Sequence, residues 1–498
     1  METGIILFLT NSEHGQASVT LAVAHELLVR SKFAVHIASF EPLAAEVTKL
    51  NKNTASLGSA TRAAHFHAIP GCSMLECVRS RLSCSFDELQ IGFSGALKVL
   101  SVLPQMIIPW DGAEYMAIYH GFVDIIEELR PVIVVLDPFL PHARDACRMT
   151  RQDRVVLLSP NTVKDLVVQP RLENLWKYPM ACSGYPCPLP WRLILPNAYL
   201  AVRAAFYMRS DKNIREIMTY RKNQGLEGEM PHFVMAQDDP TPVLIPTTPE
   251  MDFPVSVPKS FTACGPILRP WTPVADAHPE LNDWLSKRPT VVVNLGSIFR
   301  YSSAEERQFA EGFHMLLDKR PDIQILWKLP RVPSTDHDAS ALDSIADAVT
   351  DGRVRTEKWF PVEPISILLH KNVQCSVHHG GANSYYEAIR TGIPQVVLPV
   401  WFDTYDFAHR VEFLGIGVWG SRKTAPVGQG SELGEALNSV LVEDEGASMR
   451  EKAKALVSQL GHKEGRVVAC EKILSLIDES KQEEMAVKSS GNESVSQL

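Results

Sequence analysis

A glycine-rich turn between two apolar runs carries the residues of this sequence that are best placed to bind a ligand. It runs from His379 to Ser384, between the apolar run Val373–Val377 and a helical run, Tyr385–Thr391, that ends at Gly392 and Pro394. Apolar runs of this length are typical of buried parallel strands. A turn from such a strand into a helix leaves free N–H groups that suit an anion. We therefore expect an anion site at this turn.

Polar side chains around the turn suit a phosphorylated sugar. His379 and Ser384 can donate hydrogen bonds to phosphate, and Asn383 can either do so or cap the helix. Glu387 lies one helical turn further on and can accept two hydroxyl donors of a ribose diol. Asp403 follows the next apolar run and can hold sugar hydroxyls. The competing interpretation is that the Ser and Glu form an ordinary capping box.

The elements that position these residues alternate between strands and helices, which indicates doubly wound parallel sheets. The strands expected in the first half are Ile5–Leu9, Phe33–Ser39, Ala64–Ile69, Val132–Leu136 and Val155–Ser159. The helices expected there are Ser18–Arg30, Glu41–Leu50 and His120–Leu129. In the second half, the expected strands are Thr290–Leu295, Val373–Val377 and Gln395–Pro399.

Composition limits the classes of function. The 498 residues favour two domains, and 45% hydrophobic with 21% charged residues is typical of a globular protein. The net charge of −9 argues against nucleic acid or an anionic membrane surface as a partner. The nine cysteines are odd in number and form no C-x-x-C, so the sequence predicts neither zinc nor a disulfide framework and favours a reduced intracellular setting. The sequence contains no run of 18 apolar residues, so we predict no membrane span.

Five prolines break regular structure in the stretch Tyr178–Pro196. It is either a cover over an acceptor pocket or a plain connector. The run Asn197–Tyr207 that follows can form an amphipathic helix. Its apolar residues would face a lipidic acceptor or membrane surface, or else pack in the core.

The motif of the turn resembles the nucleotide-sugar signature of the family 1 glycosyltransferases, which use UDP-sugars. The matching positions are His379, Gly381, Ala382, Asn383, Ser384, Glu387, Gly392, Pro394, Pro399 and Asp403. The resemblance implies that His379, Asn383 and Ser384 contact the diphosphate, Glu387 the ribose and Asp403 the sugar. It also implies that Trp359 stacks on uracil and that Ser297, after a strand and Gly296, bonds a phosphate.

The sequence departs from that signature at positions that contact the transferred sugar and the uracil of the donor. Thr404 stands where a Gln usually follows the acidic residue, which predicts relaxed donor selectivity. Val362 stands where a Gln that contacts uracil is common, and the spacing from Trp359 to His379 is two residues longer than in the plant signature.

The resemblance also implies a catalytic His after the first strand, held by an Asp at a later strand end. Asp137 fits the second position, but Gln16 stands at the first, and an amide cannot act as a base. The candidates for the base are His14, displaced by two residues and oriented by Asp137, and His142, about one turn beyond Asp137. A third possibility is that no protein base is needed, with Gln16 as a hydrogen-bond partner on the acceptor side.

The resemblance implies a GT-B fold of two Rossmann-like domains facing a cleft. The expected organisation is an acceptor-binding domain over 1–251, a linker over 252–277, a nucleotide-sugar-binding domain over 278–465, a returning helix over 466–478 and a disordered polar tail over 479–498. The expected reaction is inverting transfer of a hexose, with glucose preferred, from a UDP-sugar to a hydroxyl of a small apolar acceptor such as a secondary metabolite, sterol or lipid.

Two other functions stay open at this point: a binding protein that lost catalysis, and a UDP-sugar hydrolase or epimerase. We expect a cytoplasmic monomer with no metal, no cofactor, no transmembrane segment and a possible peripheral contact with membranes. The pattern of the chain resembles fungal members of the family.

Overall fold

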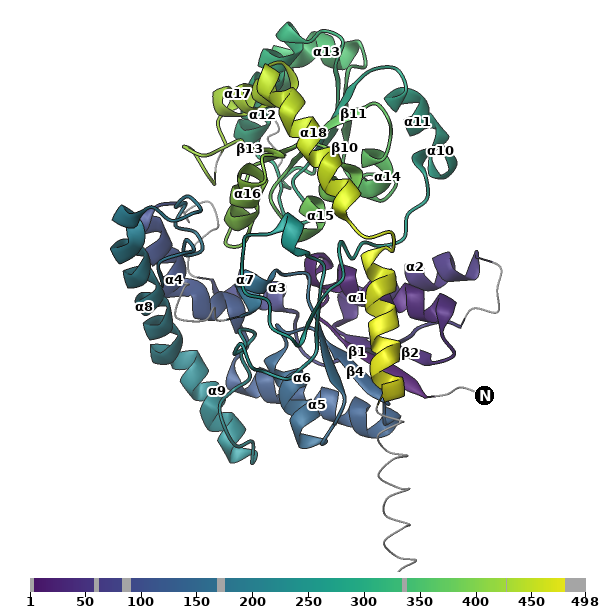
Figure 1. Cartoon of the computed structure of the whole chain (residues 1–498), viewed down its shortest axis with the longest axis vertical. Coiled ribbons are helices and arrows are strands. Elements are labelled where there is room, and N and C mark those ends of the chain that lie inside the picture. The colour runs from purple at the N-terminus through teal and green to yellow at the C-terminus, as the bar shows by residue number, and fades with distance from the viewer. Residues whose placement is uncertain are drawn as a thin grey trace, which may run out of the picture.

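The computed structural model describes residues 4–57, 62–82, 91–167, 175–333, 338–426 and 428–479. Two parallel β-sheets, each flanked by helices on both faces, form two lobes that lie one above the other in Figure 1. The predicted pair of doubly wound parallel sheets is therefore confirmed. The predicted polar tail lies outside the described residues from residue 480 onward.

The first sheet has seven strands in the order β3-β2-β1-β4-β5-β6-β7. Their bounds are β1 Ile5–Leu9, β2 Ala34–Ser39, β3 His65–Ala68, β4 Ile133–Leu136, β5 Val155–Leu158, β6 Val243–Ile245 and β7 Phe261–Ala263. The first five lie within the predicted strands, whose apolar runs suit a sheet that is buried on both faces. β6 and β7 are too short to show a pattern of apolar residues. β7 lies inside the segment 252–277, which was predicted to be a linker, and it pairs with β6.

Helices cover both faces of this sheet. The helices of the first lobe are α1 His14–Arg30, α2 Ala44–Ala55, α3 Met74–Arg81, α4 Phe93–Ile107, α5 Gly112–Leu129, α6 Pro141–Met149, α7 Val163–Leu166, α8 Ile194–Ser210 and α9 Lys212–Asn223. Side chains of α1, α2 and the helical residues 465–479 form one apolar cluster with the strands. Side chains of α4, α5, α6 and α8 form the cluster on the other face.

The second sheet has six strands in the order β10-β9-β8-β11-β12-β13. They are β8 Thr290–Asn294, β9 Gln324–Lys328, β10 Val354–Glu357, β11 Val373–His378, β12 Gln395–Val397 and β13 Gly417–Trp419. The helices of this half are α10 Val274–Ala277, α11 Pro279–Leu285, α12 Ser303–Lys319, α13 Ala346–Thr350, α14 Pro364–Leu368, α15 Ala382–Thr391, α16 Thr404–Phe413, α17 Gly430–Leu441 and α18 Asp444–Gln459. Gly392, in the left-handed conformation at φ 68°, ends α15 as predicted.

The strand order reverses once in each sheet, between β1 and β4 in the first and between β8 and β11 in the second. Ligands of open parallel sheets bind outside the carboxyl ends of the strands at such a reversal. Every predicted site residue on the loops after β1, β4, β8 and β11 therefore lies at one of these two positions.

Side chains tie the two lobes together. The Arg410 guanidinium of α16 donates to Asp252 at 2.5 Å and to the Thr162 hydroxyl at 2.8 Å. The Tyr385 hydroxyl of α15 donates to the Met251 carbonyl at 2.6 Å. Because Arg410 and Tyr385 are both fully buried, these contacts stabilise one arrangement of the lobes.

Cys72 and Cys77 are joined by a disulfide, five residues apart in the sequence. This pairing contradicts the expectation that the scattered cysteines stay unpaired, because the start of α3 brings two of them together. Over the part of the chain that the structure describes, no single helix is long and apolar enough to cross a membrane. The bent pair of α4 and α5 meets those limits jointly, by length and composition.

Candidate functional site

The turn after β11 opens into α15 with its first N–H groups free. Gly381 is the residue before the helix, and no side chain caps the helix there. The backbone N–H groups of Ala382, Asn383 and Ser384 therefore have no partner within the helix and carry the positive end of its dipole. The capping-box interpretation is wrong, because Ser384 lies inside the helix rather than at its cap.

His379 is held between two glycines. Gly296 has φ +84°, and a Cβ placed on it would lie 2.6 Å from Cε1 of His379, while a Cβ on Gly381 would overlap the same ring. Burial lowers the pKa of His379 to about 3, so its imidazole is neutral at physiological pH. Within the described residues, its buried Nδ1 has no hydrogen-bond partner. A neutral imidazole with a free nitrogen can form one hydrogen bond with a ligand at this turn.

The neighbouring His378 has a different task. Its Nε2 lies 2.8 Å from Oε1 of Gln395, and its Nδ1 accepts from the Gly380 backbone at 3.0 Å. These two contacts fix its tautomer with the proton on Nε2. His378 therefore supports the turn, and His379 faces the site.

Lys328 belongs to the site, although the sequence reasoning missed it. It ends β9, its Nζ donates to the Gly296 carbonyl at 2.8 Å, and it lies 3.5 Å from the centroid of the Trp359 ring. Burial lowers the pKa of Lys328 to about 8. The position of this lysine at the end of an apolar strand could have identified it from the sequence, since the strand ends near the reversal of the strand order bear ligand-binding groups. The structure thus brings Lys328, Trp359 and the predicted Gly296–Ser297 loop together.

Two carboxyl groups flank the turn with raised pKa values. Burial, and then the nearby Glu363 carboxylate, raise the pKa of Glu387 to about 8, and Lys328 opposes the shift. Burial and the neighbouring Asp165 carboxylate raise the pKa of Asp403 to about 7. Both groups are half-buried and are the positions predicted to accept sugar hydroxyls.

Thr404 does not offer its hydroxyl to this site. The side chain is fully buried, and its Oγ1 accepts from the backbone N–H groups of Val400 and Trp401, both at 3.1 Å. It also donates to the Trp401 carbonyl. The prediction that Thr404 contacts the sugar is corrected accordingly, because a hydroxyl that closes its own turn has no free donor.

At the reversal in the first sheet, Asp137 follows β4 and is held by Asn11. The Asn11 side-chain amide donates to Asp137 at 3.1 Å, and the backbone N–H of Phe139 donates at 2.9 Å. Burial raises the pKa of Asp137 to about 6. The predicted pair with His14 is not formed, since the Asp137 carboxylate is oriented by Asn11.

His14 is the first residue of α1 and is exposed. The charged groups that act on it are Glu46 and Lys49 of α2, Arg269 between the lobes, and Glu363, which precedes α14 in the second lobe. The described contacts therefore do not include the predicted pair of His14 with Asp137, and the role of His14 as a base stays a prediction.

The other two acceptor-side predictions have different outcomes. Gln16 lies in the first turn of α1, half-buried, and its Oε1 has no hydrogen-bond partner among the described residues. His142 is fully buried in α6, with its ring centroid 4.6 Å from that of Trp110 and 5.3 Å from that of Tyr115. Burial lowers the pKa of His142 to about 3. His142 is thus a core residue, and its acceptor-side assignment is wrong.

The two sites approach each other between the lobes. The Asn383 side-chain amide at the start of α15 donates to the Gly15 carbonyl at the start of α1, at 3.4 Å. The amino ends of two helices from different sheets therefore meet, and both contribute positive potential. A bound anion would separate these two ends and offset their repulsion.

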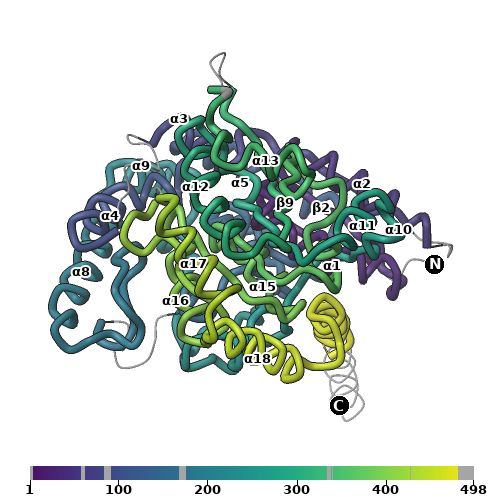
Figure 2. Tube along the Cα trace, turned by 90° about the horizontal axis from the view of Figure 1, so that it is seen from above, coloured from purple at the N-terminus to yellow at the C-terminus, as the bar shows by residue number. Residues whose placement is uncertain are grey.

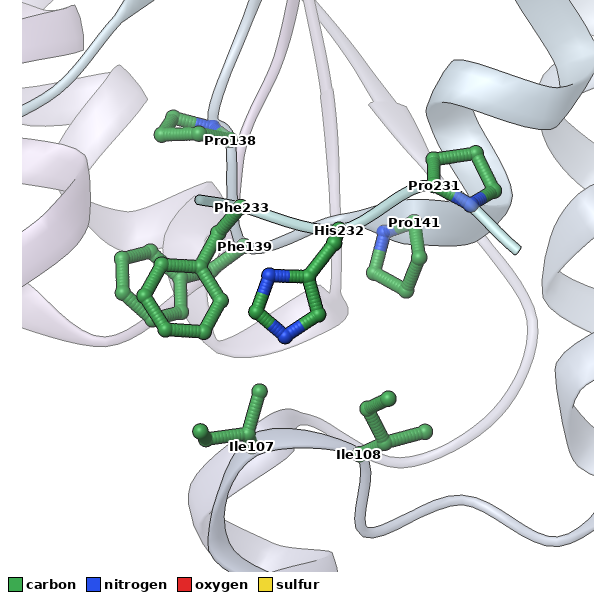
Figure 3. A pocket seen from close by; sticks show the side chains of 8 residues that line it. All are labelled: Ile107, Ile108, Pro138, Phe139, Pro141, Pro231, His232 and Phe233. Carbon is green, nitrogen blue, oxygen red and sulfur yellow. The ribbon is translucent and has the colours of Figure 1, made fainter. Parts of the chain in front are cut away.

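An apolar pocket begins directly after Asp137 (Figure 3). Its lining residues are Ile107, Ile108, Pro138, Phe139, Pro141, Pro231, His232 and Phe233. The rings of Phe139 and Phe233 stack with centroids 4.5 Å apart, and His232 stacks on Phe233 at 4.6 Å. Burial lowers the pKa of His232, so this wall is uncharged.

In the described parts of the chain, one group of side chains has a spacing that suits a metal ion: Cys72, Cys77 and Glu114. The two sulfurs are bonded to each other, and Glu114 accepts from Arg81 at 2.7 Å. A disulfide sulfur is a poor ligand because metals bind the thiolate. This group therefore does not fit a metal while the disulfide is present.

Comparison with known proteins identifies a family model and a similar full-length chain. Residues 336–460, which contain the turn and α15, match the family described as the C-terminal domain of erythromycin biosynthesis protein CIII-like proteins. The chain is 33% identical over 500 residues to glycosyltransferase sdnJ of Sordaria araneosa, covering 94% of this chain and 97% of that one.

Solved structures with the same fold include plant enzymes. A UDP-glucosyltransferase of Polygonum tinctorium matches with a TM-score of 0.62 at 15% identity, covering 95% of this chain and 98% of that chain. A Medicago truncatula protein solved with UDP-glucose matches with a TM-score of 0.60 at 15% identity, over 95% and 98% of the two chains. The two-lobed GT-B fold is shared, and the chain belongs to the family 1 glycosyltransferases, with relatives among fungi.

Proposed function

We propose that this glycosyltransferase moves a hexose, with glucose preferred, from a UDP-sugar to a hydroxyl of a small apolar acceptor. The observation that carries the proposal is the uncapped amino end of α15 beside the neutral His379 and the Lys328 ammonium. These groups are hydrogen-bond donors and positive charge of the kind that stabilises a diphosphate leaving group. The names of several similar proteins, which include UDP-glucosyltransferases, support the choice of donor.

In this proposal, the donor lies along the second sheet. The N–H groups of Ala382, Asn383 and Ser384, with Ser297, hold the diphosphate, and Glu387 accepts the ribose hydroxyls. The open side of the Trp359 ring, which is 53% exposed, takes the uracil, since the Lys328 ammonium covers the other side. Asp403 accepts hydroxyls of the sugar.

The acceptor hydroxyl approaches from the first sheet, at the carboxyl end of β4. Asp137 takes its proton, because this carboxylate follows β4 at the reversal of the strand order and is fixed by Asn11. A raised pKa near 6 leaves it ionised at neutral pH and still basic enough to help. The hydroxyl oxygen attacks the anomeric carbon, the bond to the diphosphate breaks, and attack opposite the leaving group inverts the configuration.

The test is a panel of UDP-sugars and hydroxylated acceptors, analysed by mass spectrometry. A hexose mass increase on an acceptor supports the proposal. Free sugar without a glycoside would instead indicate a hydrolase, an isomerised sugar would indicate an epimerase, and UDP binding without any product would indicate a binding protein.

The anomeric configuration of the product tests the stereochemistry separately. Nuclear magnetic resonance of the purified glycoside should give the configuration opposite to that of the donor. A retained configuration would contradict the direct displacement by the acceptor hydroxyl.

A further inference from the structure

The outward side of α8 is an apolar surface bordered by arginines. We name it the α8 face and define it by Trp191, Leu195, Tyr199, Val202 and Phe206. Their side chains are between 50% and 82% exposed. The last four recur at intervals of four, three and four residues, which places them on one stripe of the helix.

The opposite side of α8 accounts for its attachment to the protein. Its buried residues are Asn197, Leu200 and Ala204. Leu200 and Ala204 belong to the apolar cluster that also contains residues of α4, and the Asn197 amide donates to the Tyr178 carbonyl at 2.9 Å. The Phe93 ring at the start of α4 extends the α8 face, with its centroid 5.9 Å from that of Tyr199. Figures 1 and 2 both place α8 at the outer edge of the molecule, beside α4. The α8 face is therefore not needed for the core.

Within α8, α4 and the turn before α8, the charged side chains are basic, and the first acidic residue after them is Asp211, the C-cap of α8. Residues 191–210 contain Arg192, Arg203 and Arg209 and no Asp or Glu, and residues 93–107 of α4 contain Lys98 and no Asp or Glu. The Arg203 guanidinium lies 5.1 Å from the Phe206 ring centroid, so this cation lies beside the apolar stripe. The chain as a whole has a net charge of −9, so this local excess of positive charge is a departure from the average.

We infer that the α8 face docks the protein reversibly onto an anionic lipid bilayer. Helices that combine Trp, Leu and Phe on one side with arginines at the border lie in the headgroup region of bilayers. Anionic lipids attract arginines near the surface, and the apolar side chains enter the acyl boundary. The net charge of the whole chain predicts repulsion, but screening limits the reach of distant charges to about 8 Å at physiological salt, so the local charges decide.

The docking inference does not depend on the proposed reaction, since it rests on exposure and charge alone.

The test is flotation of the full chain with vesicles. One set is phosphatidylcholine, and in the other about a third of the lipid is phosphatidylserine. We expect binding to the second set that weakens when salt is raised to about 0.5 M. The variant Leu195→Ser with Phe206→Ser should lower the partition coefficient about tenfold or more. The variant Arg203→Gln with Arg209→Gln should lower it about fivefold per arginine on the anionic vesicles.

The matched control replaces two exposed apolar residues of the other lobe, Leu369→Ser with Val349→Ser, and should bind like the unmodified chain. Circular dichroism melting checks that each variant is folded. Absence of binding, equal binding to both vesicle sets, or an equal loss in the control would overturn the inference. So would a dimer in lipid-free solution that Leu195→Ser with Phe206→Ser converts to a monomer, because the face would then pair with a second copy.

Discussion

In the proposed mechanism, the carboxyl group of Asp137 acts as the base without the histidine that the sequence motif leads one to expect. Its pKa of about 6 means that the ionised, basic form predominates above that pH. We predict that Asp137→Asn lowers kcat on an aliphatic alcohol by about 10²–10⁴, the usual loss when a general base is removed. Turnover of the unmodified enzyme should rise as pH increases through about 6, as measured by initial rates at saturating donor.

His14→Ala is the comparison for this experiment. Because His14 is exposed and lies among Arg269, Glu46 and Glu363, the variant should keep nearly full turnover and full affinity for UDP. A loss of about 10² in kcat for His14→Ala, with Asp137→Asn unaffected, would show that the loop rearranges on substrate binding and that the histidine is the base.

Glu387 makes donor binding depend on pH. The pKa of about 8 means that it is largely protonated at pH 7 in the free protein, whereas a ribose diol that donates two hydrogen bonds favours the carboxylate. Affinity for UDP-glucose should therefore rise with pH below about 8 and level off above it. Calorimetry at several pH values measures this, with protons released on binding. Glu387→Gln should bind more weakly and lose the pH dependence, and a slope that survives in this variant would assign the effect to another group.

At the scale of the turn, Gly296 is required for two separate reasons. Its φ of +84° disfavours any side chain, and a Cβ would also meet the His379 ring. Gly352 has φ +70° with open space around it, so Gly352→Ala measures the backbone strain alone. We predict that Gly352→Ala lowers the free energy of unfolding by roughly 1–2 kcal/mol, and that Gly296→Ala lowers it by more and also weakens UDP binding. Equal UDP affinities in the two variants would show that His379 has no part in the site.

How much the sequence predicts follows from the length and pattern of each element. β1 and β4 are found from Ile5–Leu9 and Ile133–Leu136, because runs of apolar residues suit a sheet covered on both faces. The three-residue strand β7, in a proline-rich stretch, has no period to detect. The turn at His379 is found because its chemistry is local in sequence.

What the sequence cannot predict are contacts between distant residues. Asn11 takes the place expected for His14 beside Asp137, 126 residues further along the chain, and no local pattern encodes that choice. Lys328 joins the site through the Gly296 carbonyl, which the order of strands in the sheet decides. His142 has the residue type of a base, but the aromatic rings that surround it come from α5 and the segment before it.

For the whole molecule, the buried Arg410 sets the stability of the joint between lobes. Arg410→Ala leaves the Asp252 carboxylate without its charged partner, and breaking such a pair costs about 3–5 kcal/mol. Arg410→Met with Asp252→Asn removes both charges and should destabilise the protein less than Arg410→Met alone. Urea denaturation of this double variant and of the single variants Arg410→Met and Asp252→Asn measures the coupling, and a double variant that loses the sum of the two would show that the ion pair has none.

The helical residues 465–479 pack on the first sheet through Ala469, Cys470, Ile473 and Ile477, although about 200 residues separate them from the last strand of that sheet. During synthesis, the first sheet is complete before these residues are translated, because the whole second lobe is made in between. At translation rates of about 5–20 residues per second, this is roughly 10–40 s in which part of an apolar cluster is open to solvent. The nascent chain is therefore a natural client for chaperones, and a premature stop codon before residue 465 would release a first lobe that aggregates.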